Sequence, residues 1–87
     1  MTTHTLKCWP APFQALIDGI KTFEYRVNDR DYEVGDYLLL REWNPEAAKG
    51  TDPYTGRELN VLVTYVLHGG GSFGLHKNYV VMSVKLS

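Results

Sequence analysis

The stretch Gly19-Ile20-Lys21-Thr22-Phe23-Glu24-Tyr25-Arg26, which continues into Val27-Asn28-Asp29-Arg30, decides how the rest of this sequence is interpreted. It opens with a glycine, a residue that commonly ends a helix, and then alternates in character as a strand does. We predict a strand over residues 22–28 whose apolar face seals the core. Its polar face would hold a carboxylate, a guanidinium and an amide side by side. The apolar face consists of Phe23, Tyr25 and Val27, and the polar face of Thr22, Glu24, Arg26 and Asn28.

The composition indicates one small globular domain, which we expect to span residues 1–87. Of its 87 residues, 44% are hydrophobic and 13% aromatic, which suffices for a core without disulfides. The formal net charge of -1 disfavours a domain that holds nucleic acid by its overall charge, so an anion site has to be local. The single Cys8 excludes an internal disulfide. No apolar run approaches the roughly 20 residues that span a bilayer, and we expect a cytoplasmic protein that does not enter the membrane.

The residues before the opening stretch predict a strand and a short helix. Residues 3–9 alternate, with Leu6 and Cys8 on the apolar side, and the strand ends at Pro10 because proline cannot donate to a sheet ladder. Proline in the first turn, followed by apolar residues at helical spacing, predicts a helix of two to three turns that ends at Gly19. So short a helix is unstable alone and must dock on the sheet. The stripe that docks consists of Phe13, Leu16, Ile17 and Ile20.

The residues after the opening stretch predict three more strands. These strands cover residues 37–43, 57–68 and 78–86, with turns at 28–31 and 34–36, a loop over 44–56 and a glycine-rich connector over 69–74. The strand over 37–43 is apolar on both faces at its start, and Arg41 and Trp43 emerge at its end. The strand over 57–68 alternates, with Leu59, Val61, Val63, Tyr65 and Leu67 on one side and Asn60, Leu62, Thr64, Val66 and His68 on the other. The pattern is that of a small α+β fold, mostly β and barrel-like.

The charged residues of the opening stretch allow two interpretations. In the first, Arg26 offers a planar fork of donors to an anion, Lys21 adds a point charge, and Glu24 accepts from a nucleobase amino group or orients Arg26. In the second, they form a solvated strand face with an internal ion pair worth about 0–1 kcal/mol. Three further cations would favour the first interpretation if the fold placed them close to Lys21 and Arg26. Sequence spacing alone cannot show whether it does. These cations are Lys7, Arg30 and Arg41.

Other reactive residues fit structural roles, and we predict no metal site and no cofactor. The three histidines have neither helical pair spacing nor cysteine partners, so a hydrogen-bonded structural role is expected for each. Cys8 shares the apolar side of its strand with Leu6, which predicts a buried, inert thiol. Ser72 lacks the context of a nucleophile elbow, and the glycines around it match no phosphate-binding motif. Aromatic side chains that either close the barrel or stack on a base are Trp9, Trp43, Tyr54 and Phe73.

A succession of short motifs runs through nearly the whole chain: His4-x-Leu6-Lys7, Phe13, Gly19-x-Lys21-x-x-Glu24-x-Arg26-x-Asn28-Asp29-Arg30, Val34-Gly35-Asp36 and Leu40-x-Glu42-Trp43. This succession resembles the ASCH domain of the PUA-like superfamily, and within it the small stand-alone group catalogued as DUF3850. The resemblance implies a PUA-like β-barrel of five to six strands with one helix after the first strand. It also implies a cleft beside that helix for RNA or a nucleotide-like ligand.

Carried over by position, the resemblance implies that Lys7, Lys21, Glu24 and Arg26 line this cleft. Some ASCH proteins are amidohydrolases that act on an acylated cytidine. They use a lysine matching Lys21, a threonine three residues later and a glutamate from a later strand. Here the threonine position holds Glu24, and the last predicted strand carries no acid, so the sequence departs from the amidohydrolase pattern.

Three functions are compatible with these observations, and we favour the first. It is a module that binds RNA, a nucleoside or a nucleotide without chemistry, with cations on phosphate, Glu24 on a base edge and a tryptophan on a base face. The second is a small hydrolase, cleaving RNA or acylated cytidine, with Lys21 as base or nucleophile and Glu24 as proton shuttle. The third is a protein-interaction domain of phage or mobile-element origin. The predicted ligand site consists of Lys7, Trp9, Lys21, Glu24, Arg26, Asn28, Arg30 and Trp43.

Overall fold

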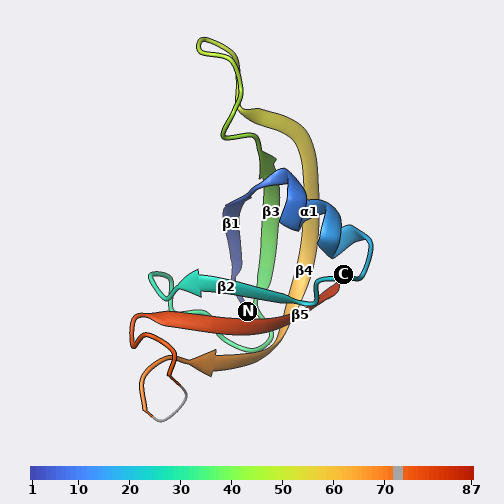
Figure 1. The fold of residues 1–87 in the computed structure, drawn as a ribbon. Helices are drawn as coiled ribbons and strands as arrows, with labels where there is room; N and C mark the ends of the chain where they lie inside the picture. Colours follow the sequence, from blue (N-terminus) through green and yellow to red (C-terminus); the bar gives the residue numbers. More distant parts are fainter. Residues whose placement is uncertain (72–73) are drawn as a thin grey trace.

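The computed structural model describes residues 1–71 and 74–87, and in them five strands form one sheet while a single helix follows the first strand (Figure 1). The elements are β1 (Thr3–Cys8), α1 (Pro10–Ile17), β2 (Phe23–Val27), β3 (Tyr37–Trp43), β4 (Tyr54–His68) and β5 (Tyr79–Leu86). The strand order is β1-β3-β4-β5-β2, with β1 parallel to β3 and the other pairs antiparallel. This mostly β half-barrel confirms the predicted fold class. None of the helical residues described forms a segment long and apolar enough to cross a membrane.

The long strand β4 bends the sheet into a half-barrel. Its first part pairs with β3 and its second part with β5, and Figure 1 shows it curving from the upright β1–β3 group to the crossing β2–β5 pair. A register shift between Val63 and Tyr65 inserts one extra residue into β4, as a β-bulge does. The bulge reverses the parity, so Tyr65 is exposed while Val66 packs against the core. The predicted alternation, which puts Tyr65 on the same side as Val61 and Val63, therefore breaks at this bulge.

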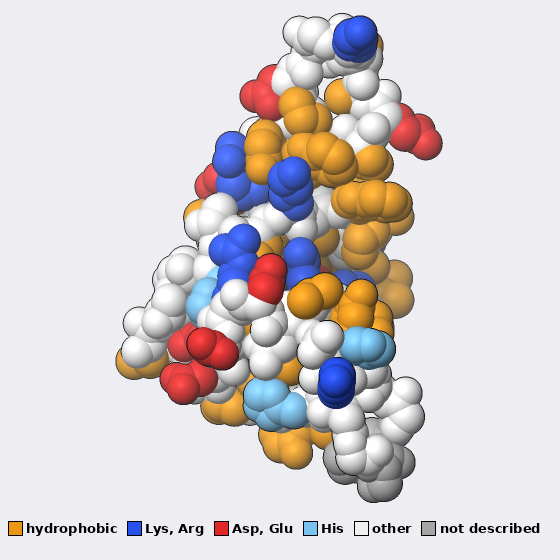
Figure 2. All heavy atoms as spheres, turned by 90° about the vertical axis from the view of Figure 1, so that its left-hand side faces the viewer, with side chains coloured by type: hydrophobic (Ala, Val, Ile, Leu, Met, Phe, Trp, Pro, Cys, Tyr) orange, Lys and Arg blue, Asp and Glu red, His pale blue; other side chains and the backbone are white. Residues whose placement is uncertain are grey.

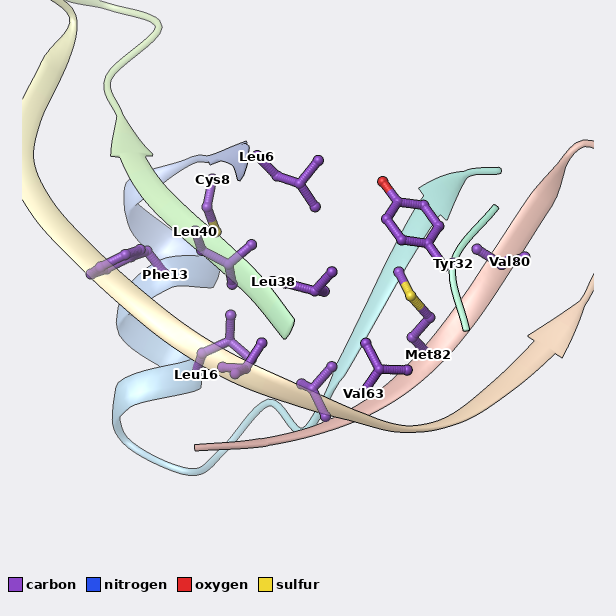
Figure 3. Close-up of a cluster of buried hydrophobic side chains, with 12 residues drawn as sticks. Leu6, Cys8, Phe13, Leu16, Tyr32, Leu38, Leu40, Val63, Val80 and Met82 are labelled. Atoms are coloured by element: carbon purple, nitrogen blue, oxygen red, sulfur yellow. The ribbon is translucent and has the colours of Figure 1, made fainter. Parts of the chain in front are cut away.

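The core lies on the inner face of the sheet, where α1 covers one part and Tyr32, Val80 and Met82 lie away from the helix, beside β2 and β5 (Figure 3). The helix contributes Phe13 and Leu16, which are buried, whereas Ile17 and Ile20 are exposed. The chain leaves the helix after Ile17, and Gly19 adopts a φ of 74° that ends it as predicted. The prediction that Ile17 and Ile20 dock is wrong, because the short helix touches the sheet along a narrow strip and Ile20 lies beyond its last turn.

Strand β2 presents the opposite face to the interior from the one predicted. Phe23, Tyr25 and Val27 are 46%, 49% and 46% exposed, whereas only 3% of Glu24 is exposed. The cause is the pairing with β5, which sets Glu24 opposite Met82 and Arg26 opposite Val80. Both β5 residues are fully buried, so their neighbours on β2 face the interior as well. The expectation that the apolar face of residues 22–28 seals the core is thus wrong.

The other strands agree more closely with the sequence. β3 has the predicted bounds, and β1 buries Leu6 and Cys8 as expected. β4 begins three residues before the predicted strand, at Tyr54, so the predicted loop over 44–56 covers only residues 44–53. In the predicted turn at 28–31, Asp31 has a φ of 48°, a conformation that aspartate tolerates better than most residues.

A buried histidine–aspartate contact fixes the corner where β1 meets the turn before β3. His4 Nε2 lies 2.9 Å from Asp36 Oδ2, and Asp36 also accepts hydrogen bonds from the backbone N–H groups of Thr2 and Glu33. Burial alone would raise the pKa of Asp36, but these hydrogen bonds outweigh it and hold the pKa below its ordinary value. The predicted structural role of His4 is confirmed.

Candidate functional site

The two edge strands of the half-barrel, β1 and β2, lie on either side of an opening that we call the seam. Edge strands leave backbone groups without sheet partners. One such group is the carbonyl oxygen of Lys7 on β1, which accepts a hydrogen bond of 2.8 Å from Arg26 Nη2 on β2. A single arginine side chain therefore crosses the seam, and it joins two strands that are separated by the whole sheet in strand order.

The cations beside the seam are organised by a buried carboxylate. Glu24 Oε1 lies 2.9 Å from Lys21 Nζ, and Glu24 Oε2 lies 3.0 Å from Arg26 Nε. The Glu24 side chain is 4% exposed, whereas those of Lys21 and Arg26 are 20% and 24% exposed. A buried carboxylate requires such partners, and two cations on one anion leave the cluster with one net positive charge. The ion pair anticipated from the sequence exists, but it is not a solvated strand face.

Two cavities open at the seam. The larger has a volume of about 520 Å³ and the smaller about 340 Å³. The larger is lined by Thr5, Leu6, Lys7, Tyr25, Arg26, Val27, Asp29, Arg30, Tyr32, Arg41, Tyr54 and Tyr79. The smaller is lined by Lys7, Cys8, Trp9, Pro12, Lys21, Glu24, Tyr25 and Arg26. Three residues, Lys7, Tyr25 and Arg26, line both, so the cavities adjoin along one shared wall.

The larger cavity is basic although the whole chain is slightly acidic. Four cations line it, together with one acid, Asp29. Figure 2 views the side on which β1 lies in Figure 1, and it shows Lys and Arg side chains gathered across the middle of that side. Arg41 lies 3.2 Å from Glu58 and stands over the Tyr54 ring, whereas Arg30 approaches Asp29 only to 3.8 Å. Lys7 forms no salt bridge with the described residues, so Lys7 and Arg30 are the cations least committed to protein partners.

The predicted site residues divide between the two cavities. Lys7, Arg26 and Arg30 line the larger cavity, and Lys7, Arg26, Trp9, Lys21 and Glu24 line the smaller. Two predicted residues line neither. Asn28 has a buried Oδ1 without a hydrogen-bond partner among the described residues, and the ring of Trp43 lies 4.7 Å below Lys7 Nζ. The predictions for Ser72 and Phe73 lie outside the described residues.

Three tyrosines of the larger cavity were not assigned to the site from the sequence: Tyr25, Tyr32 and Tyr79. Tyr25 and Tyr79 stack, with ring centroids 5.0 Å apart and an interplanar angle of 19°. They meet because β2 pairs with β5, and no local pattern encodes that pairing. The one available signal was the number of tyrosines, six in 87 residues.

Cys8 lies in the wall of the smaller cavity as a buried thiol. Burial, followed by the charge of Glu24, raises the pKa of Cys8 to about 11. A raised pKa favours the thiol over the reactive thiolate at neutral pH, and the predicted burial of Cys8 is confirmed.

Comparison with known proteins places this architecture in a family. A family model described as "Domain of unknown function (DUF3850)" matches residues 3–84, which include every residue that lines the two seam cavities. The chain is also similar to the "Uncharacterized 12.9 kDa protein in GpA 3'region" of Escherichia phage P2. The two are 36% identical over 63 residues, which make up 72% of this chain and 52% of the phage protein. The chain spans about half the length of that relative.

Proposed function

We propose that this chain, which belongs to the DUF3850 family, is a module that binds single-stranded RNA or a nucleotide at the seam between β1 and β2. The proposal includes the assignment of the half-barrel to the ASCH group of the PUA-like superfamily, as a single cytoplasmic domain. The observation that carries it is the lining of the larger cavity, where four cations and four tyrosines surround about 520 Å³.

This combination matches the chemistry of a nucleotide. Arginine and lysine side chains donate to phosphate oxygens, and aromatic rings stack on a base for about 1–3 kcal/mol per base. The volume falls in the range of about 300–1,000 Å³ that is common for small-molecule sites. The stacked pair of Tyr25 and Tyr79 supplies a ring surface next to Arg26 and Arg30, so a base and its phosphate could be held together.

The contacts of Lys21 and Glu24 support binding over hydrolysis. Both candidate catalytic groups are already paired, because Lys21 Nζ donates to Glu24 Oε1 at 2.9 Å. The other oxygen of Glu24 accepts from Arg26 Nε, so both carboxylate oxygens hold cations in place. We therefore assign Glu24 to the positioning of Arg26. We assign Lys21 to the positive charge of the seam.

Titration of short single-stranded RNA at two salt concentrations tests the proposal. The variants Lys7→Ala and Arg30→Ala remove cations with few protein contacts, so each is expected to fold normally. Each should weaken binding about 5- to 30-fold and lower the slope of log affinity against log salt by about 1. Lys49→Ala, an exposed lysine of the loop over 44–53, is the matched control and should bind as the parent does. No binding at low salt, or equal affinities in all four proteins, would remove the proposed function.

A further inference from the structure

The shared wall of the two seam cavities contains the groups that a bridging phosphate requires. Arg26 lines both cavities, and its guanidinium carries five N–H donors. Two of them are occupied, one by Glu24 Oε2 and one by the carbonyl oxygen of Lys7. The remaining donors have no hydrogen-bond partner among the described residues. Lys7 also lines both cavities, with its Nζ 4.7 Å from the centroid of the Trp43 ring. An anion at this wall would have one cavity on each side.

Each cavity also offers an aromatic surface, and Tyr25 in the shared wall lines both cavities. On one side stand the stacked rings of Tyr25 and Tyr79. On the other stands Trp9, which is 59% exposed and caps the start of α1 beside Pro12. The smaller cavity, at about 340 Å³, lies near the lower limit for small-ligand sites and suits one planar group better than an extended molecule.

We infer that the ligand of the seam is a dinucleotide step of a single strand, and not a single nucleotide. The bridging phosphate lies against Arg26 and Lys7, one base stacks on the tyrosines of the larger cavity, and the other stacks on Trp9 in the smaller one. The inference rests on the proposed function and adds to it the length of the recognised unit and a binding role for each cavity. Joining two weakly held bases through one phosphate raises the affinity because the second base binds within the same molecule.

The test compares a 5′-mononucleotide with the corresponding dinucleotide and with a dinucleotide whose linkage is an uncharged methylphosphonate, by calorimetry on the parent protein. The dinucleotide should bind at least about tenfold more tightly than the mononucleotide, since one more base stacks. The uncharged linkage should lose most of that gain, because it removes the anion between Arg26 and Lys7.

Substitution of Trp9 gives the decisive variant. Trp9→Ala should remove the gain of the dinucleotide and leave mononucleotide affinity unchanged, because the tyrosine cavity is untouched. Tyr65→Ala is the matched control, since Tyr65 is an equally exposed aromatic that lines neither cavity. Equal affinities for mononucleotide and dinucleotide, or an equal loss of both in Trp9→Ala, would overturn the inference while leaving the proposed function in place. Absence of binding by every ligand would overturn both.

Discussion

The two edge strands of the half-barrel bury opposite kinds of residue. β1 turns Leu6 and Cys8 inward and leaves Thr5 and Lys7 exposed, as an amphipathic strand is expected to do. β2 has an equally regular alternation, yet it turns Glu24 inward and leaves its apolar residues about half exposed. Both strands border the seam, and each supplies one cation to the basic cavity there, Lys7 from β1 and Arg26 from β2.

The contrast shows that alternation defines two faces without deciding which one is buried. Glu24 tolerates burial because Lys21 and Arg26 bind its two carboxylate oxygens. These contacts replace the hydrogen bonds that the carboxylate would otherwise make with water. The apolar residues of β2 in turn lie beside Tyr79 and Val81 of β5 on the outer face of the sheet. The ion pairs of Glu24 with Lys21, just before β2, and with Arg26 on β2 thus combine with apolar pairing between β2 and β5 to reverse the usual arrangement.

The largest expected effect concerns the apolar residues of the two strands. Leu6→Ala should lower the free energy of unfolding by about 2–5 kcal/mol, because it opens a cavity in the core. Val27→Ala on β2 should cost less than about 1 kcal/mol, because the side chain is already half exposed. Urea denaturation followed by circular dichroism measures both. Similar losses in the two variants would contradict the inverted orientation of β2.

The next effect concerns the buried carboxylate of β2. Glu24→Ala should lower the free energy of unfolding by about 2–3 kcal/mol, because Lys21 and Arg26 lose their shared partner. We expect less than for a fully buried ion pair, since both cations retain access to water. Glu58→Ala, which breaks the exposed contact with Arg41, is the control and should cost at most about 1 kcal/mol. If the two substitutions lowered the free energy of unfolding equally, Glu24 would lie on a solvated strand face, which is the second interpretation of the sequence.

The smallest effect concerns the one polar residue that β1 buries, His4, and its partner Asp36. The folded protein holds the pKa of Asp36 below its ordinary value of 3.8, so this carboxylate stabilises the fold at every pH above that value. Its contribution should disappear as the pH falls below 3.8 toward the lower folded value. Urea midpoints measured between pH 3 and pH 6 should therefore fall less steeply in Asp36→Asn than in the parent protein. Parallel curves would show that Asp36 contributes nothing to the acid sensitivity.

Local features were predictable and non-local ones were not. The bounds of β3 and the end of α1 follow from residues next to one another in sequence, such as the Gly35 turn and Gly19. The gathering of Lys7 with Arg26 depends on two strands at opposite ends of the strand order. Tyr79 joins the larger cavity only through the β2–β5 pairing, and Tyr65 leaves the core because of a bulge. None of these is encoded by periodicity.

The sequence by itself determined that the chain forms a mostly β fold with one helix after its first strand, and that cations and aromatic rings occur near Glu24. It could do so because turn residues, proline and alternation act over a few neighbouring residues. Only the tertiary structure decided which face of β2 is buried and that the seam holds two adjoining cavities. The physical reason is that burial depends on the partner a strand finds across the sheet, and that partner is set by long-range pairing.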